Sequence, residues 1–233
     1  MLMLLPLVVA LAAAEPAPAP SSSARPTPLT EIGRVRALPA CVPIVAHANG
    51  AITQALDNDR SLAIITTNLR NTDFDKLNFM QRRNAIEAIM KQAEAMRVAS
   101  SAGDVEVKKL REYAVNSPDP ERKAELKTFA DALGGALYRQ KKAAVELMRD
   151  VTILRGREET QEARDTMAQN NQIPPNVARL TGVPITAAPT PTPAPAYNRQ
   201  MQYMSDTLDG MSKGILTDEG VAADHSIAAT SGC

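Results

Sequence analysis

Apolar residues recur at alternating intervals of four and three residues through the middle of the chain, most regularly between Pro120 and Leu154. A repeat of this kind aligns its apolar side chains along one side of a helix that packs against other helices over its length. The stripe consists of Leu126, Ala130, Leu133, Leu137, Ala144, Leu147, Val151 and Leu154, with polar Gln140 in one repeat position. Neighbouring apolar residues widen it, which favours a bundle of three or four helices over a two-stranded coiled coil.

Two further long helices are expected before this one. The first runs from about Pro43 to Leu69, and the second from about Lys76 to Ala114 with an interruption or bend at 100–103. The third begins at Pro120, because Asp119 is a good N-cap and proline suits the first helical position. Two glycines, Gly134 and Gly135, indicate either the close approach of a neighbouring backbone or a bend in the third helix. Beyond Leu154 the stripe gives way to polar residues up to 169, which either project into solvent or await a partner.

The flanks of the bundle have a different composition. Residues 1–14 are almost wholly apolar and end in three alanines, which predicts a signal peptide, with a buried or interfacial segment as the alternative. Residues 15–39 form a spacer rich in Pro, Ala and Ser that leads irregularly into the bundle domain at 40–169, and residues 170–196 form a second Pro-rich linker.

The four-three repeat returns briefly after the linker. It predicts a short amphipathic helix over 197–212, followed by a flexible tail over 213–233. This helix is either a fourth member of the bundle or a detachable docking element. Its candidate partner-docking face is Tyr197, Met201, Met204, Leu208 and Met211.

The predicted fold is therefore all-α: an elongated antiparallel bundle of three long helices, with a short tethered C-terminal helix and Pro-rich disordered flanks. The 233 residues carry 26 basic and 26 acidic side chains, so no net charge attracts nucleic acid or an anionic membrane. Fourteen apolar residues fall short of the roughly twenty that span a bilayer, and no membrane span is expected after signal cleavage.

The two cysteines are Cys41, just before the first helix, and Cys233, the last residue. In an exported protein an even number of cysteines favours a disulfide. Cys41 and Cys233 are a candidate pair, with two unpaired thiols or an intermolecular bridge as the alternatives.

No arrangement of residues typical of an enzyme or a bound cofactor is found. His47 and His225 are the only histidines, and His47 has no convergent metal ligands at helical spacing. Asn71, Asp73 and Asp75 alternate as at the start of a calcium loop, but the glycine and glutamate that such a loop requires are missing. Met201, Met204 and His225 leave copper or haem carriage as an alternative function. The expected protein is non-catalytic and holds no cofactor.

One segment has a family resemblance. Residues 77–82, Leu-Asn-Phe-Met-Gln-Arg, open a helix after a turn and resemble the LTxxQ motif of small all-helical periplasmic stress chaperones. Asn78 stands where that family has threonine, and Ile86 comes one residue later than the usual isoleucine. The resemblance implies a cradle of helices that binds unfolded clients or an envelope component.

Taken together, the sequence predicts an exported protein, periplasmic or secreted, that acts in protein–protein interaction or envelope structure. Its partner would be another protein or a second copy, bound through helix faces. A periplasmic carrier of a small molecule, haem or copper is the alternative.

Overall fold

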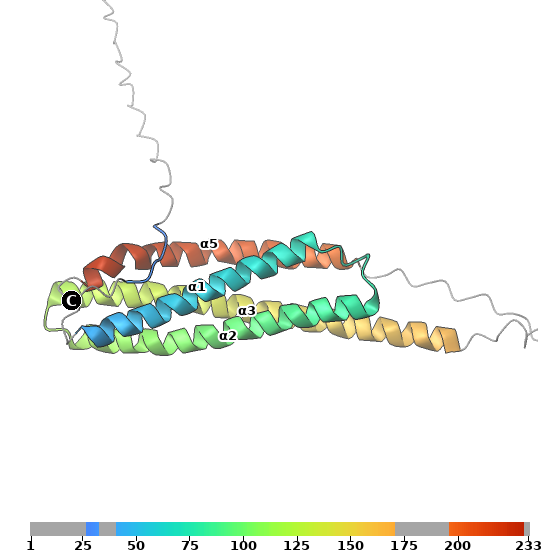
Figure 1. The fold of residues 1–233 in the computed structure, drawn as a ribbon, viewed down its shortest axis with the longest axis horizontal. Helices are drawn as coiled ribbons and strands as arrows, with labels where there is room; N and C mark the ends of the chain where they lie inside the picture. The colour runs from blue at the N-terminus through green and yellow to red at the C-terminus, as the bar shows by residue number, and fades with distance from the viewer. Residues whose placement is uncertain (1–26, 33–40, 171–195, 231–233) are drawn as a thin grey trace, which may run out of the picture.

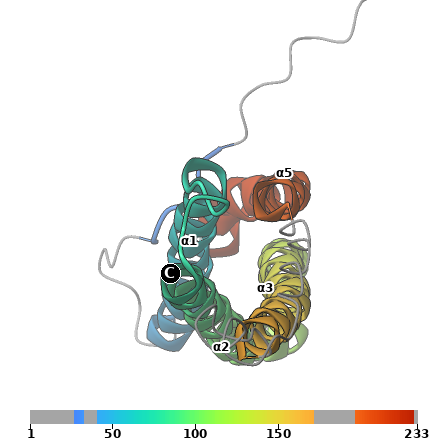
Figure 2. The same ribbon diagram turned by 90° about the vertical axis from the view of Figure 1, so that its right-hand side faces the viewer.

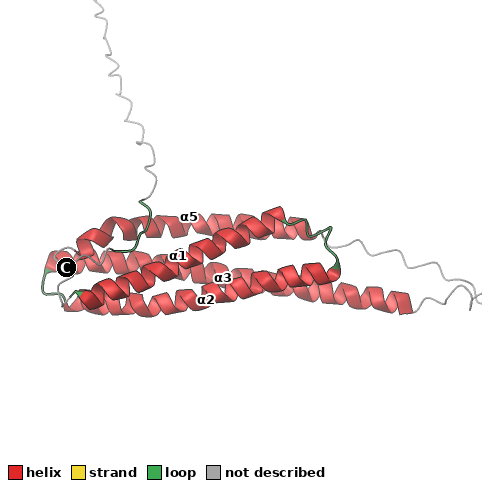
Figure 3. Ribbon diagram, in the orientation of Figure 1, coloured by secondary structure: helices red, strands yellow, loops and turns green. Residues whose placement is uncertain are grey.

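A computed structural model describes residues 27–32, 41–170 and 196–230. Within these residues the secondary structure consists of helices joined by loops (Figure 3). The helices are α1 (Val42–Asn71), α2 (Phe79–Asn116), α3 (Pro120–Asn170) and α5 (Tyr197–Thr230). The predicted all-α class is therefore confirmed.

The four helices form an elongated antiparallel bundle in which each helix reverses the direction of the one before it (Figure 1). Seen from the end, they surround a common axis in the order α1, α2, α3, α5 (Figure 2). The 51 residues of α3 span about 77 Å, whereas the 38 residues of α2 span about 57 Å. As a result, the C-terminal part of α3 extends past the other three helices at the end of the bundle where α2 and α5 begin.

Local capping explains where two of the helices begin. Asn78 caps α2: its side chain accepts a hydrogen bond from the Gln81 backbone N–H, while the Gln81 side chain accepts one from the Asn78 backbone. This reciprocal pair is a capping box, which satisfies two N–H groups that the first turn of a helix leaves open. At α3, as predicted, Asp119 Oδ1 accepts from the Glu121 backbone N–H at 3.0 Å and Pro120 begins the helix.

Buried apolar side chains form two clusters along the bundle. The distal cluster lies at the end where α5 begins and includes Ile65, Ile86, Leu147 and Met201. The proximal cluster lies toward the end where α1 begins and includes Ile52, Leu110 and Leu133. Every described helix contributes to both clusters, so each cluster holds all four helices together.

The C-terminal helix differs from its predicted length. α5 has 34 residues and reaches Thr230, so most of the expected flexible tail is helical and packed. Beyond residue 212 the repeat continues with Ile215 and then only with small or polar residues that the structure buries: Glu219, Ala222, Ser226 and Ala229. Such residues do not form an apolar stripe in the sequence, so the prediction of a helix that ends at 212 is wrong.

Glycines in the long helices make room for neighbouring side chains. The helix α2 continues through 100–103, so the interruption predicted there is absent. A Cβ built on Gly103 would lie 2.8 Å from both methyl groups of Leu137. Likewise, Cβ atoms on Gly134 and Gly135 would lie 2.8 Å from the side chains of Arg111 and Asp218. The close neighbours of the two glycines of α3 are therefore side chains, and the prediction of a closely approaching backbone is wrong.

A pair of glycine substitutions tests this packing. Replacing Gly103 with alanine should lower the free energy of unfolding by about 1–3 kcal/mol, because Leu137 is fully buried and has little room to move. Gly210 has no atom within 4 Å of its built Cβ, so Gly210→Ala should instead raise it by about 0.5–1 kcal/mol through helix propensity. Urea unfolding of both variants checks this, and equal stabilisation by both would contradict the close packing.

Candidate functional site

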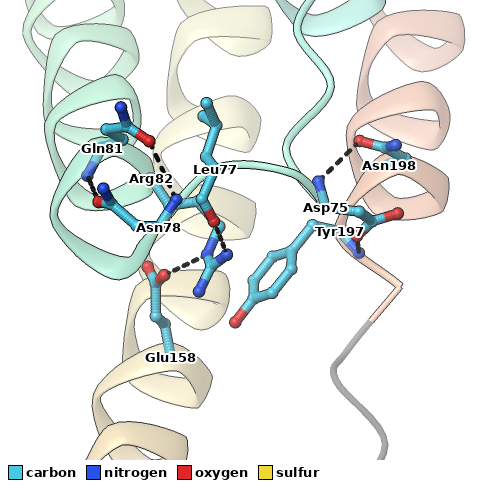
Figure 4. Close-up of polar contacts among 8 residues, drawn as sticks. All are labelled: Asp75, Leu77, Asn78, Gln81, Arg82, Glu158, Tyr197 and Asn198. Atoms are coloured by element: carbon cyan, nitrogen blue, oxygen red, sulfur yellow. Dashed lines mark hydrogen bonds and ion pairs between the residues drawn. The ribbon is translucent and has the colours of Figure 1, made fainter.

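The start of α5 is held by the turn between α1 and α2 (Figure 4). Asp75 Oδ1 accepts a hydrogen bond from the Tyr197 backbone N–H at 3.0 Å, and the Asp75 backbone donates to Asn198 Oδ1 at 3.3 Å. Asn198 also donates to Asp73 Oδ1 at 2.8 Å. Asp73 and Asp75 of this turn therefore cap the start of α5. The sequence pattern alone did not indicate this role.

Beside this cap lies an ion pair that joins α2 to α3. Arg82 Nε is 2.7 Å from Glu158 Oε1, and only 4% of the Glu158 side chain is exposed. The Arg82 guanidinium also donates to the Leu77 carbonyl oxygen and lies 4.8 Å from the centre of the Tyr197 ring. Figure 4 shows Arg82 between these groups, so one side chain connects α2, α3 and α5.

The predicted partner-docking face of the C-terminal helix lies inside the bundle. Tyr197, Met201, Met204 and Leu208 are each at most 5% exposed, and Met211 packs against the same distal cluster. In this conformation the stripe packs against the protein's own core. Periodicity predicted the apolar face correctly but could not tell which surface covers it.

Between the two apolar clusters each helix contributes a buried polar side chain. Asn58 of α1 donates to Ser100 of α2 at 2.9 Å and to Gln140 of α3 at 3.0 Å. Gln140 in turn donates to the Ala55 carbonyl at 3.0 Å and to Glu219 of α5 at 3.3 Å. We call Asn58, Asp59, Ser100, Gln140 and Glu219 the polar layer.

Two carboxyl groups meet in this layer. Glu219 is 4% exposed, and its side chain is hydrogen-bonded to that of half-buried Asp59, which also accepts from Gln140 at 2.9 Å. Burial, reinforced by the charge of Asp59, raises the pKa of Glu219 to about 9. Burial also raises the pKa of Asp59, against the hydrogen bonds from Glu219 and Gln140 that lower it. At neutral pH Glu219 is therefore protonated and donates to Asp59.

The outer surface of the distal end has a groove between α3 and α5. A hollow of about 230 Å³ lies between Arg149, Ile153 and Arg157 on one side and Gln200 and Tyr203 on the other. Ile153 is 50% exposed and Tyr203 is 68% exposed. Gln200 Oε1 is buried and accepts no hydrogen bond among the described residues. We call this hollow, with the adjoining surface of α3 up to residue 167, the distal groove.

Arginines follow the groove along α3. Arg149, Ile153, Arg157, Thr160, Arg164 and Met167 are spaced by three or four residues, which places them on one face of the helix. A second hollow of about 450 Å³ adjoins Arg157, Thr160 and Arg164. The described ion pairs nearby join Arg149 to Asp150 and Arg155 to Glu159, and leave Arg157 and Arg164 without a described acidic partner. The groove is thus apolar at its centre and positively charged along one wall.

The residues considered for metal binding do not converge. Met201 and Met204 lie in the distal cluster, whereas His225 contacts Glu125 at 2.5 Å near the other end. Twenty-one residues of helix separate Met204 from His225, which is about 32 Å. His47 lies 2.5 Å from Glu106. Among the described residues no three His, Cys, Asp or Glu side chains gather as a metal site would require.

Cys41 lies at the start of α1, 3% exposed, where its sulfur accepts from Arg122 Nη2 at 3.2 Å. The described part of the chain contains no free cysteine. Cys233 lies outside the described residues, but α5 ends only three residues before it, and Ala229 shares the proximal cluster with Ile44. The described geometry therefore favours the Cys41–Cys233 pair, which stays a prediction.

Comparison of the chain with models of known protein families, with curated proteins and with solved structures finds no match. The capping box accounts for Asn78 and Gln81 of the LTxxQ-like segment by local hydrogen bonding. None of the four described helices has the length and apolar character needed to cross a membrane. Functional inference therefore depends on the geometry of the distal groove and of the polar layer.

Replacing Arg82 with methionine should lower the free energy of unfolding by about 3–5 kcal/mol, because it leaves the buried Glu158 carboxylate without its partner. The double variant Arg82→Met/Glu158→Leu should regain most of that loss, since no unpaired charge then stays buried. Urea unfolding of the two variants gives the comparison. A double variant as unstable as the single one would show that the ion pair is not the main contribution of Arg82.

Replacing Cys233 with serine tests the disulfide. A Cys41–Cys233 bond closes a loop of about 190 residues, and its loss should lower the free energy of unfolding by up to about 5 kcal/mol on the chain-entropy model. The intact mass of the unreduced protein should match a monomer with one disulfide. A mass corresponding to two free thiols or to a linked dimer would refute the pairing.

Proposed function

We propose that this protein is an exported, non-catalytic interaction protein, whose bundle is a rigid scaffold and whose distal groove binds an acidic amphipathic helix of a partner protein. The observation that carries the proposal is the distal groove, where exposed Ile153 and Tyr203 lie beside Arg157 and Arg164, which have no acidic partner among the described side chains. Export rests on the apolar residues 1–14, which lie outside the described residues.

The shape of the groove supports a helical partner. α3 passes the start of α5, so beyond Tyr197 no described helix of this chain covers that side of α3. The exposed residues on that side keep the three- and four-residue spacing by which helices pack along each other. A partner helix lying there would extend the bundle by taking the place that α5 occupies further along.

The charges of the groove determine the kind of helix. Arg157 and Arg164 would face the flanks of a docked helix, where glutamate or aspartate would complete ion pairs. Ile153 and Tyr203, both exposed, would pack against its apolar side. An apolar stripe flanked by acidic residues fits each of these features.

A synthetic helical peptide can test the proposal. The probe has leucines in a four-three repeat flanked by glutamates, and its matched control has lysines in place of the glutamates. Fluorescence anisotropy should show that the acidic peptide binds and the basic one does not. Reversing two groove charges, Arg157→Glu/Arg164→Glu, should weaken binding at least tenfold, because attraction becomes repulsion at two positions.

A charge-matched variant is the control for this experiment. Lys91→Glu/Lys108→Glu changes the net charge equally, on exposed residues of α2 away from the groove. It should retain most of the binding. Equal loss in both double variants would show that the peptide responds only to net charge, and unchanged binding in both would place its site elsewhere.

A further inference from the structure

The two halves of α5 are held to the bundle by different forces. The first half buries the large side chains Tyr197, Met201, Met204 and Leu208, and its start is capped by the α1–α2 turn. Apart from Ile215, the second half buries small or polar residues, namely Glu219, Gly220, Ala222, Ala223, Ser226 and Ala229. Because small side chains bury little apolar area, polar contacts carry a larger share of its attachment.

These polar contacts run along the second half of the helix. Asp218 pairs with Arg139 of α3 at 2.7 Å, and Asp224 accepts from Thr27 at 2.6 Å. His225 contacts Glu125 of α3 at 2.5 Å. These three contacts are partly exposed. The polar contact that Glu219 makes in the polar layer is buried.

The Glu219 contact depends on a proton. Gln140 Nε2 lies 2.9 Å from Asp59 Oδ1 and 3.3 Å from Glu219 Oε1, which brings the two carboxyl groups together. Two neighbouring carboxyl groups share a hydrogen bond only when one of them is protonated. From α3, Gln140 donates to both, and Arg139 pairs with Asp218 beside Glu219. α2 contributes Ser100, which is uncharged and reaches the layer through Asn58. When the proton leaves, two negative charges therefore face each other in a buried site.

We propose that the proton shared by Asp59 and Glu219 is a latch that holds the second half of α5 on α1 and α3, so that rising pH releases this half while the other three helices stay assembled. Among the described helices, the backbone of α5 packs against α3 and α1, and the Arg82 contact with α2 lies at Tyr197 in the first half, so release of the second half leaves the α1–α2 and α2–α3 interfaces intact. The inference is independent of the distal groove, which lies beside the first half of α5.

The direction of the pH effect follows from the two states of Glu219. In the closed state its pKa is about 9, and once the helix opens to water it returns toward the ordinary 4.5. The closed state thus binds the proton more tightly, and the stabilisation is complete below pH 4.5 and lost as pH rises toward 9. Within this window the opening constant should increase by up to about tenfold per pH unit.

Hydrogen exchange with mass spectrometry on the full protein tests the latch. With exchange rates corrected for the intrinsic effect of pH, peptides covering 213–230 should lose protection by about 100-fold between pH 6 and pH 8. Peptides from α2 and from 197–208 should show no such change. Glu219→Gln keeps a hydrogen-bond donor to Asp59 without a titrating proton, and should abolish the pH dependence.

Three results would overturn the proposal: no pH dependence in 213–230, the same dependence in Glu219→Gln, or a parallel loss of protection in every helix. The last would indicate global unfolding rather than local release. Asp59→Asn is a second variant, in case the first does not fold. This variant removes the negative charge that helps to raise the pKa of Glu219, so the pH dependence of exchange in 213–230 should become smaller. An unchanged pH dependence would exclude Asp59 from the latch.

Discussion

A layer of hydrogen-bonded polar side chains, drawn from all four helices, determines how the helices are aligned. Asn58, Ser100, Gln140 and Glu219 are each at most 4% exposed and lie between two apolar clusters. A buried polar group without a partner costs about 1–3 kcal/mol. Sliding any helix by one repeat would move its polar residue against apolar neighbours and leave the others unpaired. Apolar clusters alone allow several registers between the helices. The polar layer therefore selects one of them.

This alignment has consequences at both ends of the bundle. With Gln140 opposite Asn58 and Glu219, the 51 residues of α3 have to extend beyond the start of α5, which exposes the wall of the distal groove. The same alignment puts the Asp75 carboxylate at the first N–H of α5 and Arg82 beside Glu158. Toward the other end it leaves small residues of α5 against α1 and α3, where contact depends more on polar groups. The proposed binding surface and the proposed latch thus arise from one register.

Much of the fold was predictable from residue patterns because its main features are local. The four-three stripe, the Asp119 cap and Pro120 specify the course of α3, and the polar residue in its repeat, Gln140, is visible in the sequence. The second half of α5 was not predictable, since Glu219 is buried by virtue of partners on other helices. Similarly, the stripe from Tyr197 to Met211 required burial, but only the folded chain shows that its own core provides it. The distal groove exists because α3 extends beyond the start of α5. No local sequence pattern predicts how far one helix extends beyond another.

Whether the polar layer fixes the register can be tested most directly by making the layer apolar. In the variant Asn58→Leu/Gln140→Leu/Glu219→Leu, half-buried Asp59 can turn to solvent, so the bundle should stay folded. Spin labels at exposed Asp57 and Leu216, attached without cysteine chemistry, report the distance between α1 and α5. The native protein should give one narrow distance distribution, and the variant should give several. A single narrow distribution in the folded variant would contradict this role of the polar layer, because the apolar clusters alone would then fix the alignment.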